Sequence, residues 1–175
     1  MKFQTLIIEE FNLMFAEMEK VLDGLDTDDL HQRPAPGANP IGWLCWHTIR
    51  SCDRFLGDVV TGHQRWIYED WHTKFHRPPD YNDTGYGHTA AQVDLLRIPS
   101  VKTLEDYGRE VKAQLMDYLE KLTEKELDRK APNSVKPGTT RPVSERLVGL
   151  LNNTQHVGQA GYVRGIIKGH GWYGR

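Results

Sequence analysis

His47, Asn152 and His156 have the residue types and the spacing of a metal-binding site. Asn152 and His156 stand four positions apart in a predicted helix, and side chains at i and i+4 lie on one face of a helix. His47 lies at the edge of the apolar stripe of another predicted helix, from which it could reach that pair. Two imidazoles and a third ligand can hold a divalent metal and leave positions open. The alternative is that both histidines are hydrogen-bonded core residues, and the neutral amide of Asn152 is a weaker ligand than a carboxylate or an imidazole.

Four further residues are candidates for the wall of a ligand pocket at this site. Trp43 precedes the first histidine by one helical turn, and Gln159 shares a helix face with the second. His88 belongs to a TGYGHT loop that could form a lid, and Arg164 could hold an anionic group of a substrate or lie paired at the surface. The other histidines are expected in loops or at the surface: His31, His63, His72, His76 and His170.

Other catalytic signatures are missing from the sequence. It contains no G-x-S-x-G motif, no P-loop, no G-x-G-x-x-G motif and no C-x-x-C pair. Cys45 and Cys52 lie two turns apart on one predicted helix, and the ~10 Å rise between them exceeds the ~7 Å limit on the Cα separation in a disulfide. Both belong to an apolar stripe, so we expect buried, unreactive thiols and a reducing, cytoplasmic location.

Apolar residues repeat at helical spacing in the four long segments that must position these groups. The stripes predict helices over residues 3–23, 40–61, 104–122 and 143–168. Asn39 is expected to cap the second of these helices ahead of Pro40, and Thr103 to cap the third. Shorter helices are expected within residues 66–75 and 89–96 and from residue 123, and residues 131–142, with three prolines, are expected to form a loop.

These segments predict an all-α fold with a single domain over residues 1–175. Four long amphipathic helices predict a four-helix bundle, here with a long insert over residues 63–101 between the second and third helices. Connections of that length are usually functional or disordered, and the aromatic residues of the insert favour function. Because bundles hold metals and ligands between facing helices, His47 and His156 have positions that such a fold can use together.

Composition excludes several classes of protein. The chain has 175 residues, a formal net charge of −2 and 38% hydrophobic residues, which is typical of a globular domain. No surplus of basic residues indicates a nucleic-acid partner. The mean hydropathy is −0.61, and no apolar run approaches the ~20 residues of a transmembrane helix. The N-terminal sequence lacks the apolar core and cleavage site of a signal peptide.

The segment NPIGWLCWHTIRSCDRFL, followed far downstream by QHVGQAGYVRG, resembles the DinB-like (YfiT-like) superfamily. That superfamily includes mycothiol-dependent maleylpyruvate isomerase and bacterial thiol S-transferases, and the DTGYGHT loop is similar to an uncharacterised branch of it. The resemblance extends from Met1 to about Lys168. It implies an up-down-down-up bundle, often a homodimer, with a divalent metal held by a histidine of the second helix and two residues at i and i+4 of the last. His47, Asn152 and His156 match those positions, and Asn152 departs from the usual His or Glu.

The resemblance implies an enzyme in which a divalent metal, zinc or nickel, activates a low-molecular-weight thiol. The reaction would be S-transfer or isomerisation of a small-molecule substrate, or hydrolysis. The alternative is a non-catalytic ligand-binding or stress-associated bundle that keeps the pocket but has lost the metal site through Asn152. A third hypothesis is an interaction module that works as a homodimer through the first and last helices. No nucleic acid and no membrane are expected as partners.

Overall fold

The computed structural model describes residues 2–169 and 171–173 of the chain. The described elements, in chain order, are α1 (Phe3–Leu22), α2 (Thr27–His31), α3 (Ile41–Leu56), the π-helical turn η1 (Gly57–Thr61), α4 (Arg65–Tyr68), α5 (Trp71–Lys74), α6 (Ala90–Leu95), α7 (Val101–Glu120), α8 (Glu124–Asp128), β1 (Lys130–Pro132), β2 (Thr140–Pro142), α9 (Val143–Leu151) and α10 (Asn153–Lys168). The all-α fold class predicted from the apolar stripes is confirmed, with one small hairpin added.

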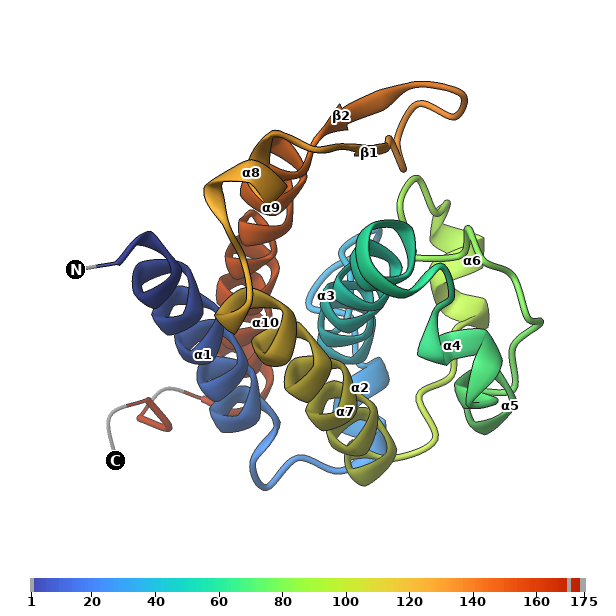
Figure 1. Cartoon of the computed structure of the whole chain (residues 1–175). Helices are drawn as coiled ribbons and strands as arrows, with labels where there is room; N and C mark the ends of the chain where they lie inside the picture. The colour runs from blue at the N-terminus through green and yellow to red at the C-terminus, as the bar shows by residue number, and fades with distance from the viewer. Residues whose placement is uncertain (1, 170, 174–175) are drawn as a thin grey trace.

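Four long helices, α1, α3, α7 and α10, surround a common core (Figure 1). Helix α1 packs against α7 and α10, and α3 packs against the same two helices from the other side. The Gln4 side chain at the start of α1 donates to the carbonyl of Leu122, just after the end of α7, so these helices run in opposite directions. Phe55 and Tyr118 meet near the ends of α3 and α7, which run the same way.

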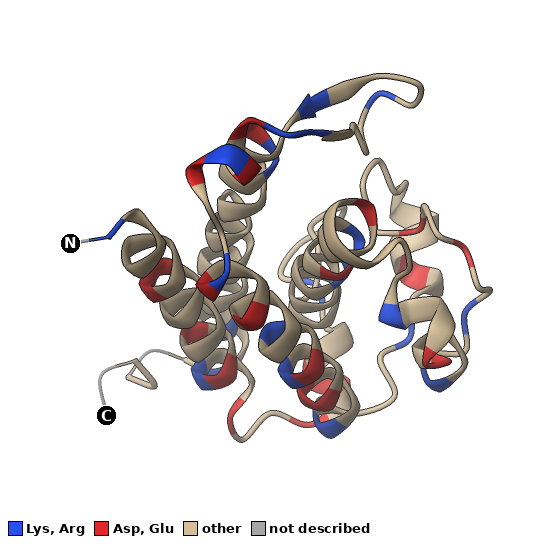
Figure 2. Cartoon of the chain, viewed as in Figure 1, with Lys and Arg blue, Asp and Glu red and all other residues tan. Residues whose placement is uncertain are grey.

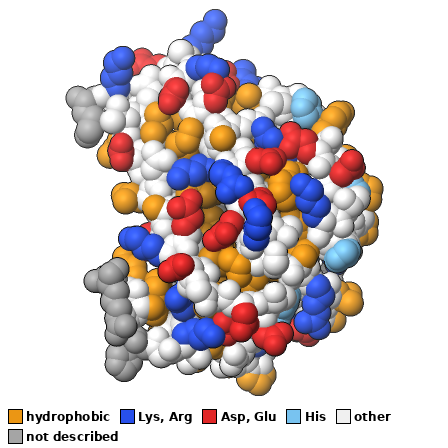
Figure 3. All heavy atoms as spheres, turned by 90° about the horizontal axis from the view of Figure 1, so that it is seen from below, with side chains coloured by type: hydrophobic (Ala, Val, Ile, Leu, Met, Phe, Trp, Pro, Cys, Tyr) orange, Lys and Arg blue, Asp and Glu red, His pale blue; other side chains and the backbone are white. Residues whose placement is uncertain are grey.

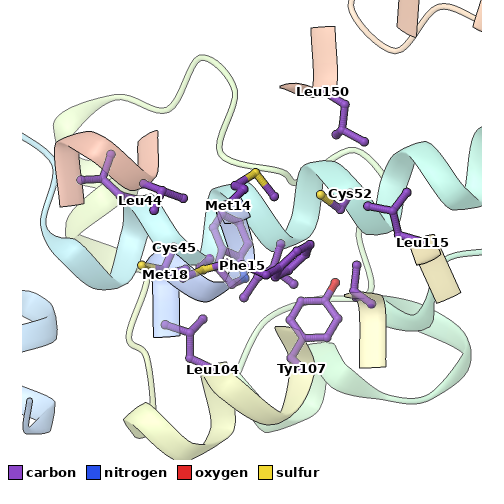
Figure 4. Close-up of a cluster of buried hydrophobic side chains, with 14 of the residues drawn as sticks. Met14, Phe15, Met18, Leu44, Cys45, Cys52, Leu104, Tyr107, Leu115 and Leu150 are labelled. Atoms are coloured by element: carbon purple, nitrogen blue, oxygen red, sulfur yellow. The ribbon is translucent and has the colours of Figure 1, made fainter. Parts of the chain in front are cut away.

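The core takes apolar side chains from all of these helices (Figure 4). Phe15 and Met18 of α1 lie with Leu44 of α3, and Leu104 of α7 lies below them in this view. Burying such side chains is the main favourable term in folding, at about 25 cal/mol per Å² of apolar surface. The packing of each apolar stripe against its neighbours therefore explains why these four segments form helices together.

Both cysteines lie in this core as free thiols, as the sequence predicts. Burial alone raises the pKa of Cys45 to about 12, and burial together with neighbouring Asp53 raises the pKa of Cys52 as well. A thiol with a raised pKa carries almost no thiolate at neutral pH. Neither cysteine is therefore a nucleophile in the folded chain.

The helix boundaries differ from the predicted ones where capping decides them. Helix α3 begins at Ile41 with Pro40 as the N-cap residue, instead of beginning at Pro40 behind Asn39. Pro40 has extended backbone angles, and its carbonyl accepts the bond from Leu44 that begins the helix. Helix α7 begins three residues early, because the hydroxyl of Ser100 accepts a bond from the amide of Thr103. Ser100, and not Thr103, is therefore the cap of this helix.

The predicted helix over residues 143–168 is interrupted at Asn152. Helix α9 ends at Leu151 and α10 begins at Asn153. The amide of Gln155 bonds to the carbonyl of Asn152 at 3.1 Å, a tighter turn than an α-helix makes. Just before α9, residues that were expected to form a loop pair as a short antiparallel hairpin, with Ala131 opposite Arg141. Strands of three residues are too short to show alternation in a sequence.

A buried polar network fastens the insert to the bundle. Arg50 is fully buried, and its guanidinium donates to Asp53, to the side chain of Gln64 and to the carbonyl of Asp83. The carboxylate of Asp53 also accepts a 2.6 Å bond from the hydroxyl of Tyr107 on α7. Buried charges are tolerated when paired and hydrogen-bonded in this way. The insert therefore has a fixed position beside α3.

The outer surface carries charges of both signs. Lys and Arg lie among Asp and Glu along α7 and α8, whereas α1 carries mainly Glu (Figure 2). The face seen from below has blue and red side chains next to one another (Figure 3). Many of these charges pair within one helix, as Lys102 does with Asp106. Within the described residues, no helix combines the length and the apolar character that crossing a membrane requires.

Candidate functional site

The structure brings the two predicted histidines together. His47 projects from the middle of α3 and His156 from the first turn of α10, and their ring centroids are 4.8 Å apart in an edge-to-face arrangement. Helices α3 and α10 pack closely, and this packing brings the two rings together. Two imidazoles at this separation can bind a common ion or exchange a proton with a common ligand.

His47 is held by the insert. Only 7% of the residue is exposed, and its Nδ1 atom lies within hydrogen-bonding distance of the carbonyl oxygen of Thr84. A carbonyl only accepts, so Nδ1 carries the proton and Nε2 keeps a lone pair. Burial lowers the pKa of His47 to about 4, with smaller contributions from His156 and His88, against the opposing effect of the bond to Thr84. The imidazole is therefore neutral at neutral pH.

His156 has a partner of its own. Its Nδ1 atom lies 3.0 Å from the side-chain oxygen of Gln159, one turn further along α10. The oxygen accepts the Nδ1 proton, so His156 also keeps its Nε2 lone pair. Gln159, predicted as a pocket residue, thus lies beside the site and orients a histidine. Two imidazoles that each engage Nδ1 and leave Nε2 free are the arrangement in which protein histidines bind metals.

Trp43 contacts His47, and His88 contacts Trp43. The Trp43 indole stacks on the His47 ring, with centroids 4.9 Å apart and planes 12° apart. Its N–H donates to Nδ1 of His88 at 3.3 Å, and Nε2 of His88 lies 2.9 Å from a carboxylate oxygen of Asp83. Both ring nitrogens of His88 are therefore engaged, and no lone pair is left for a metal. The loop over residues 81–88 contacts His47 through the carbonyl of Thr84, and His88 is bonded to Asp83 within that loop.

A cavity of about 560 Å³ opens beside the histidine pair. Asn152 lines it together with His47 and His156, so all three predicted metal residues share one cavity. Its other walls come from α3, the 81–86 loop, the hairpin, α9 and the start of α10: Ser51, Arg54, Phe55, Asn82, Thr84, Tyr86, Asn133, Ser134, Val135, Pro137, Arg141, Glu145, Arg146, Gly149, Leu150 and Asn153. Among residues 2–169 and 171–173, no group of three His, Cys, Asp or Glu side chains is close enough together to bind a metal.

The sequence matches the model of the DinB superfamily over residues 10–160. The chain belongs to the DinB superfamily. A conserved protein of Enterococcus faecalis has a similar crystal structure, with a TM-score of 0.85 at 24% identity over 97% of this chain and 99% of that one. A DinB-like protein of Bacillus cereus ATCC 10987 has a TM-score of 0.59 at 22% identity over 90% of this chain and 87% of that one. No curated protein matches the sequence significantly.

Arg164 of this DinB superfamily protein lies away from the histidine pair. It follows His156 by two turns on α10, does not line the cavity, and donates to the carbonyls of Val21 and Asp23 at the end of α1. A cation at a helix C-terminus is favourable, so a structural role accounts for its position. Its guanidinium also lies 5.0 Å from the ring of Trp172, which docks on the bundle. His170 lies outside the described residues.

The other described histidines of the protein lie outside the cavity. His63 and His76 are exposed, and Nδ1 of half-buried His72 contacts the carbonyl of Arg77. Nε2 of His31 accepts a hydrogen bond from the amide of Ile98, and this bond joins the end of the insert to α2.

The residues that sequence reasoning missed are the arginines of the cavity wall. Arg54 is seven positions after His47, so the two lie on one face of α3, and Arg146 approaches from α9. The spacing of Arg54 from His47 could have predicted its place beside the site. The place of Arg146 could not be predicted, because it depends on the packing of α3 against α9.

Proposed function

We propose that this DinB superfamily protein binds a divalent metal, zinc or nickel, through the Nε2 atoms of His47 and His156. The observation that carries the proposal is the pair of hydrogen bonds that both Nδ1 atoms donate, one to the carbonyl of Thr84 and one to the side-chain oxygen of Gln159. Metal-binding histidines usually donate their second nitrogen to a carbonyl or carboxylate, which fixes the tautomer and the orientation of the ring. A histidine with only a structural role in the core would not need a second histidine beside it whose Nε2 atom is also free.

The donor set fits a site with few protein ligands and several open positions. Imidazole suits zinc, copper, iron and nickel, and the side-chain oxygen of Asn152 on the same cavity wall is a weaker third donor. Open positions are what a catalytic metal needs to accept a substrate. A bound divalent ion lowers the pKa of a coordinated thiol, so that thiolate forms at neutral pH. The substrate we propose is a low-molecular-weight thiol, used for S-transfer or isomerisation.

The surrounding residues give the pair a defined task. Thr84 and Gln159 hold the two rings, and the indole of Trp43 covers the buried side of His47 and keeps water from it. The depressed pKa of His47 keeps it unprotonated well below neutral pH, so it does not have to lose a proton before binding a cation.

The competing function is a ligand-binding bundle without a metal. It is favoured by Asn152 and by the lack of a third histidine or carboxylate beside the pair among the described residues. In that case the two imidazoles would hydrogen-bond directly to a ligand in the cavity.

A metal titration of the chelator-treated protein separates these functions. We expect near-stoichiometric binding of zinc or nickel by calorimetry, abolished in His47→Ala and in His156→Ala. His63→Ala changes an exposed histidine outside the cavity and serves as the matched control. No binding by the parent, together with strong binding by Asn152→His, would establish the metal-free alternative.

The thiol is tested by a second measurement on the loaded protein. Cobalt-substituted protein treated with 2-mercaptoethanol should gain a thiolate-to-metal charge-transfer absorption, and the same treatment of His156→Ala should give none. An unchanged spectrum in the parent would remove the thiol from the proposal while leaving the metal.

We also propose that the protein forms a homodimer through α1 and α10. Large apolar side chains are exposed on these two helices: Leu6 and Leu13 on α1, Tyr162 and Ile166 on α10. Exposed apolar surface of this kind marks interaction sites when it is contiguous. Light scattering at micromolar concentration should give twice the monomer mass, and a monomer would refute the dimer.

A further inference from the structure

The end of the cavity remote from the histidine pair carries arginines. Arg54 follows His47 by seven residues on α3, a rise of about 10 Å along the helix axis. Arg146 reaches the same place from α9, and its Nη2 atom lies 2.9 Å from the Asp58 carboxylate. Nε of Arg54 is 3.8 Å from the same carboxylate. Because α3 and the α9–α10 pair run in opposite directions, the cavity has histidines at one end and guanidinium groups at the other.

The positive charge at this end is only partly neutralised. Among the described ion pairs, Arg54 and Arg146 share the single carboxylate of Asp58, which also accepts from the hydroxyl of Tyr81. Arg141 lines the same cavity but is paired with Glu145 at 2.8 Å. Two guanidinium groups against one carboxylate leave one net positive charge in a place that is largely out of water.

Arg54 has hydrogen-bonding capacity that the protein does not use. Its Nη2 atom donates to the side chain of Asn82 at 3.0 Å, but its buried Nε–H has no hydrogen-bond partner in the structure. Burial is also the main reason why the pKa of Arg54 falls below its usual value. Arginine stays protonated in proteins. Arg54 lines the cavity, so it brings to this wall a cationic side chain whose hydrogen-bonding capacity the protein does not fully use.

Asn153 gives a second, independent sign of a missing acceptor. It lines the cavity, is only 5% exposed, and its side-chain Nδ2 atom has no hydrogen-bond partner in the structure. Buried amide N–H groups are nearly always satisfied by protein, water or ligand. Asn153 and Arg54 both line the cavity, so a carboxylate bound there would lie beside two side chains with donors that the protein leaves unsatisfied.

We propose that this end of the cavity binds the carboxylate of an elongated organic acid, with Arg54 and Asn153 as its donors. The single unneutralised positive charge matches a carboxylate better than a doubly charged phosphate. The remainder of such a ligand would run along α3 toward the histidine pair, about 10 Å away. A cavity of about 560 Å³ is in the range that small-molecule ligands occupy. The placement of the ligand's other end at the histidines rests on the proposed function; the carboxylate subsite does not.

Hexanoate and hexanamide test the subsite in the full-length, chelator-treated protein. The two probes share the same carbon chain, and only hexanoate is charged and accepts with both of its end atoms, so we expect calorimetry or NMR titration to give at least about tenfold tighter binding of hexanoate. Arg54→Gln should remove that preference and Arg54→Lys should restore part of it. Arg109→Gln is the matched control, because Arg109 lies exposed on α7 outside this cavity. Tighter binding of hexyl phosphate than of hexanoate would overturn the assignment to a carboxylate.

Asn153→Leu keeps the test valid even if changes at Arg54 disturb the fold. Leucine has the same branched shape as asparagine, although it is larger, and it removes the unpaired N–H, so the free energy of unfolding should stay level or rise while hexanoate binds several-fold more weakly. Unchanged hexanoate affinity in both Arg54→Gln and Asn153→Leu would overturn the proposal. So would equal affinities of the parent for hexanoate and hexanamide.

Zinc titration of the same variants separates this proposal from the metal site. Arg54→Gln should bind zinc as the parent does, since Arg54 lies two turns from His47. A parent that binds no zinc but discriminates hexanoate from hexanamide supports the subsite and refutes the metal. A parent that binds zinc without that discrimination refutes the subsite alone.

Discussion

Gly85→Ala tests how the insert positions His47. Gly85 has a φ of +90°, and a Cβ atom at this position would lie 2.9 Å from Cζ2 of Trp43, 3.1 Å from Cζ3 of Trp46 and 3.2 Å from Nδ1 of His47. The neighbouring carbonyl of Thr84 is the acceptor that fixes the His47 tautomer. A methyl group at residue 85 therefore acts on the candidate site directly, without removing any proposed ligand.

The expected loss of folding stability in Gly85→Ala is the sum of two costs. A non-glycine residue at positive φ costs about 1–2 kcal/mol, and overpacking beside rigid aromatic rings costs about 1–3 kcal/mol more. Gly87 lies two residues further, with a φ of +77° and nothing within 4 Å of its added Cβ. Gly87→Ala therefore carries the first cost alone. We expect Gly85→Ala to destabilise the fold by about 2–5 kcal/mol and Gly87→Ala by about 1–2 kcal/mol.

Urea denaturation of both variants measures these costs, and zinc titration reads the site. Losing the acceptor for Nδ1 should weaken zinc binding by about 10- to 100-fold in Gly85→Ala, with little change in Gly87→Ala. Equal destabilisation by the two substitutions would show that the loop does not press against the Trp43–His47 stack. Unchanged zinc affinity in a folded Gly85→Ala variant would refute the role given to Thr84.

Three more predictions concern the buried groups. Asp53→Ala should lower the free energy of unfolding by about 3–5 kcal/mol in urea denaturation, because it leaves the buried charge of Arg50 unpaired. The folded-state pKa of His47 lies at about 4, below its ordinary 6.5, so the unfolded chain binds the extra proton between these values and stability should fall with decreasing pH. The loss over that window is up to about 3 kcal/mol for the chelator-treated protein, and thermal unfolding of His47→Gln should lack it. Cys45 and Cys52 should react slowly with a thiol reagent in the folded protein and at once in urea, whereas fast reaction of the folded protein would show that they are accessible.

Apolar periodicity is enough to predict the main helices, and local bonds decide where they end. The stripes of α1, α3 and α7 repeat over many turns, so the sequence signal is strong. The starts of α3 and α7 depend on which single side chain or carbonyl takes the first free amide, and Ser100 does this where Thr103 was expected. The break at residue 152 had a signal in the sequence, the run Asn-Asn-Thr, since these residues compete for backbone hydrogen bonds within a helix.

Some residues of the site could likewise be predicted from the sequence, and others could not. His47 and His156 could be predicted because each stands at a defined place on its own helix. The network of Arg50 and the meeting of Arg54 with Arg146 could not, because they join segments that only the packed bundle brings together. Long-range pairings of charged side chains leave no periodic trace in a sequence. For that reason the sequence indicated a metal site and missed the charged end of the same cavity.

The helix break at Asn152 also sharpens the choice between the proposed functions. The side chain of Asn152 makes no capping bond to α10, and it lines the cavity beside the histidine pair. The junction therefore does not depend on the amide, and Asn152→His should change stability by no more than about 0.5 kcal/mol, as surface substitutions do. A gain of metal affinity in that variant can then be assigned to the added imidazole and not to a refolded junction. If the parent already binds zinc well, the amide is a sufficient third donor; if only the variant does, the cavity belongs to the organic ligand and the two histidines serve it directly.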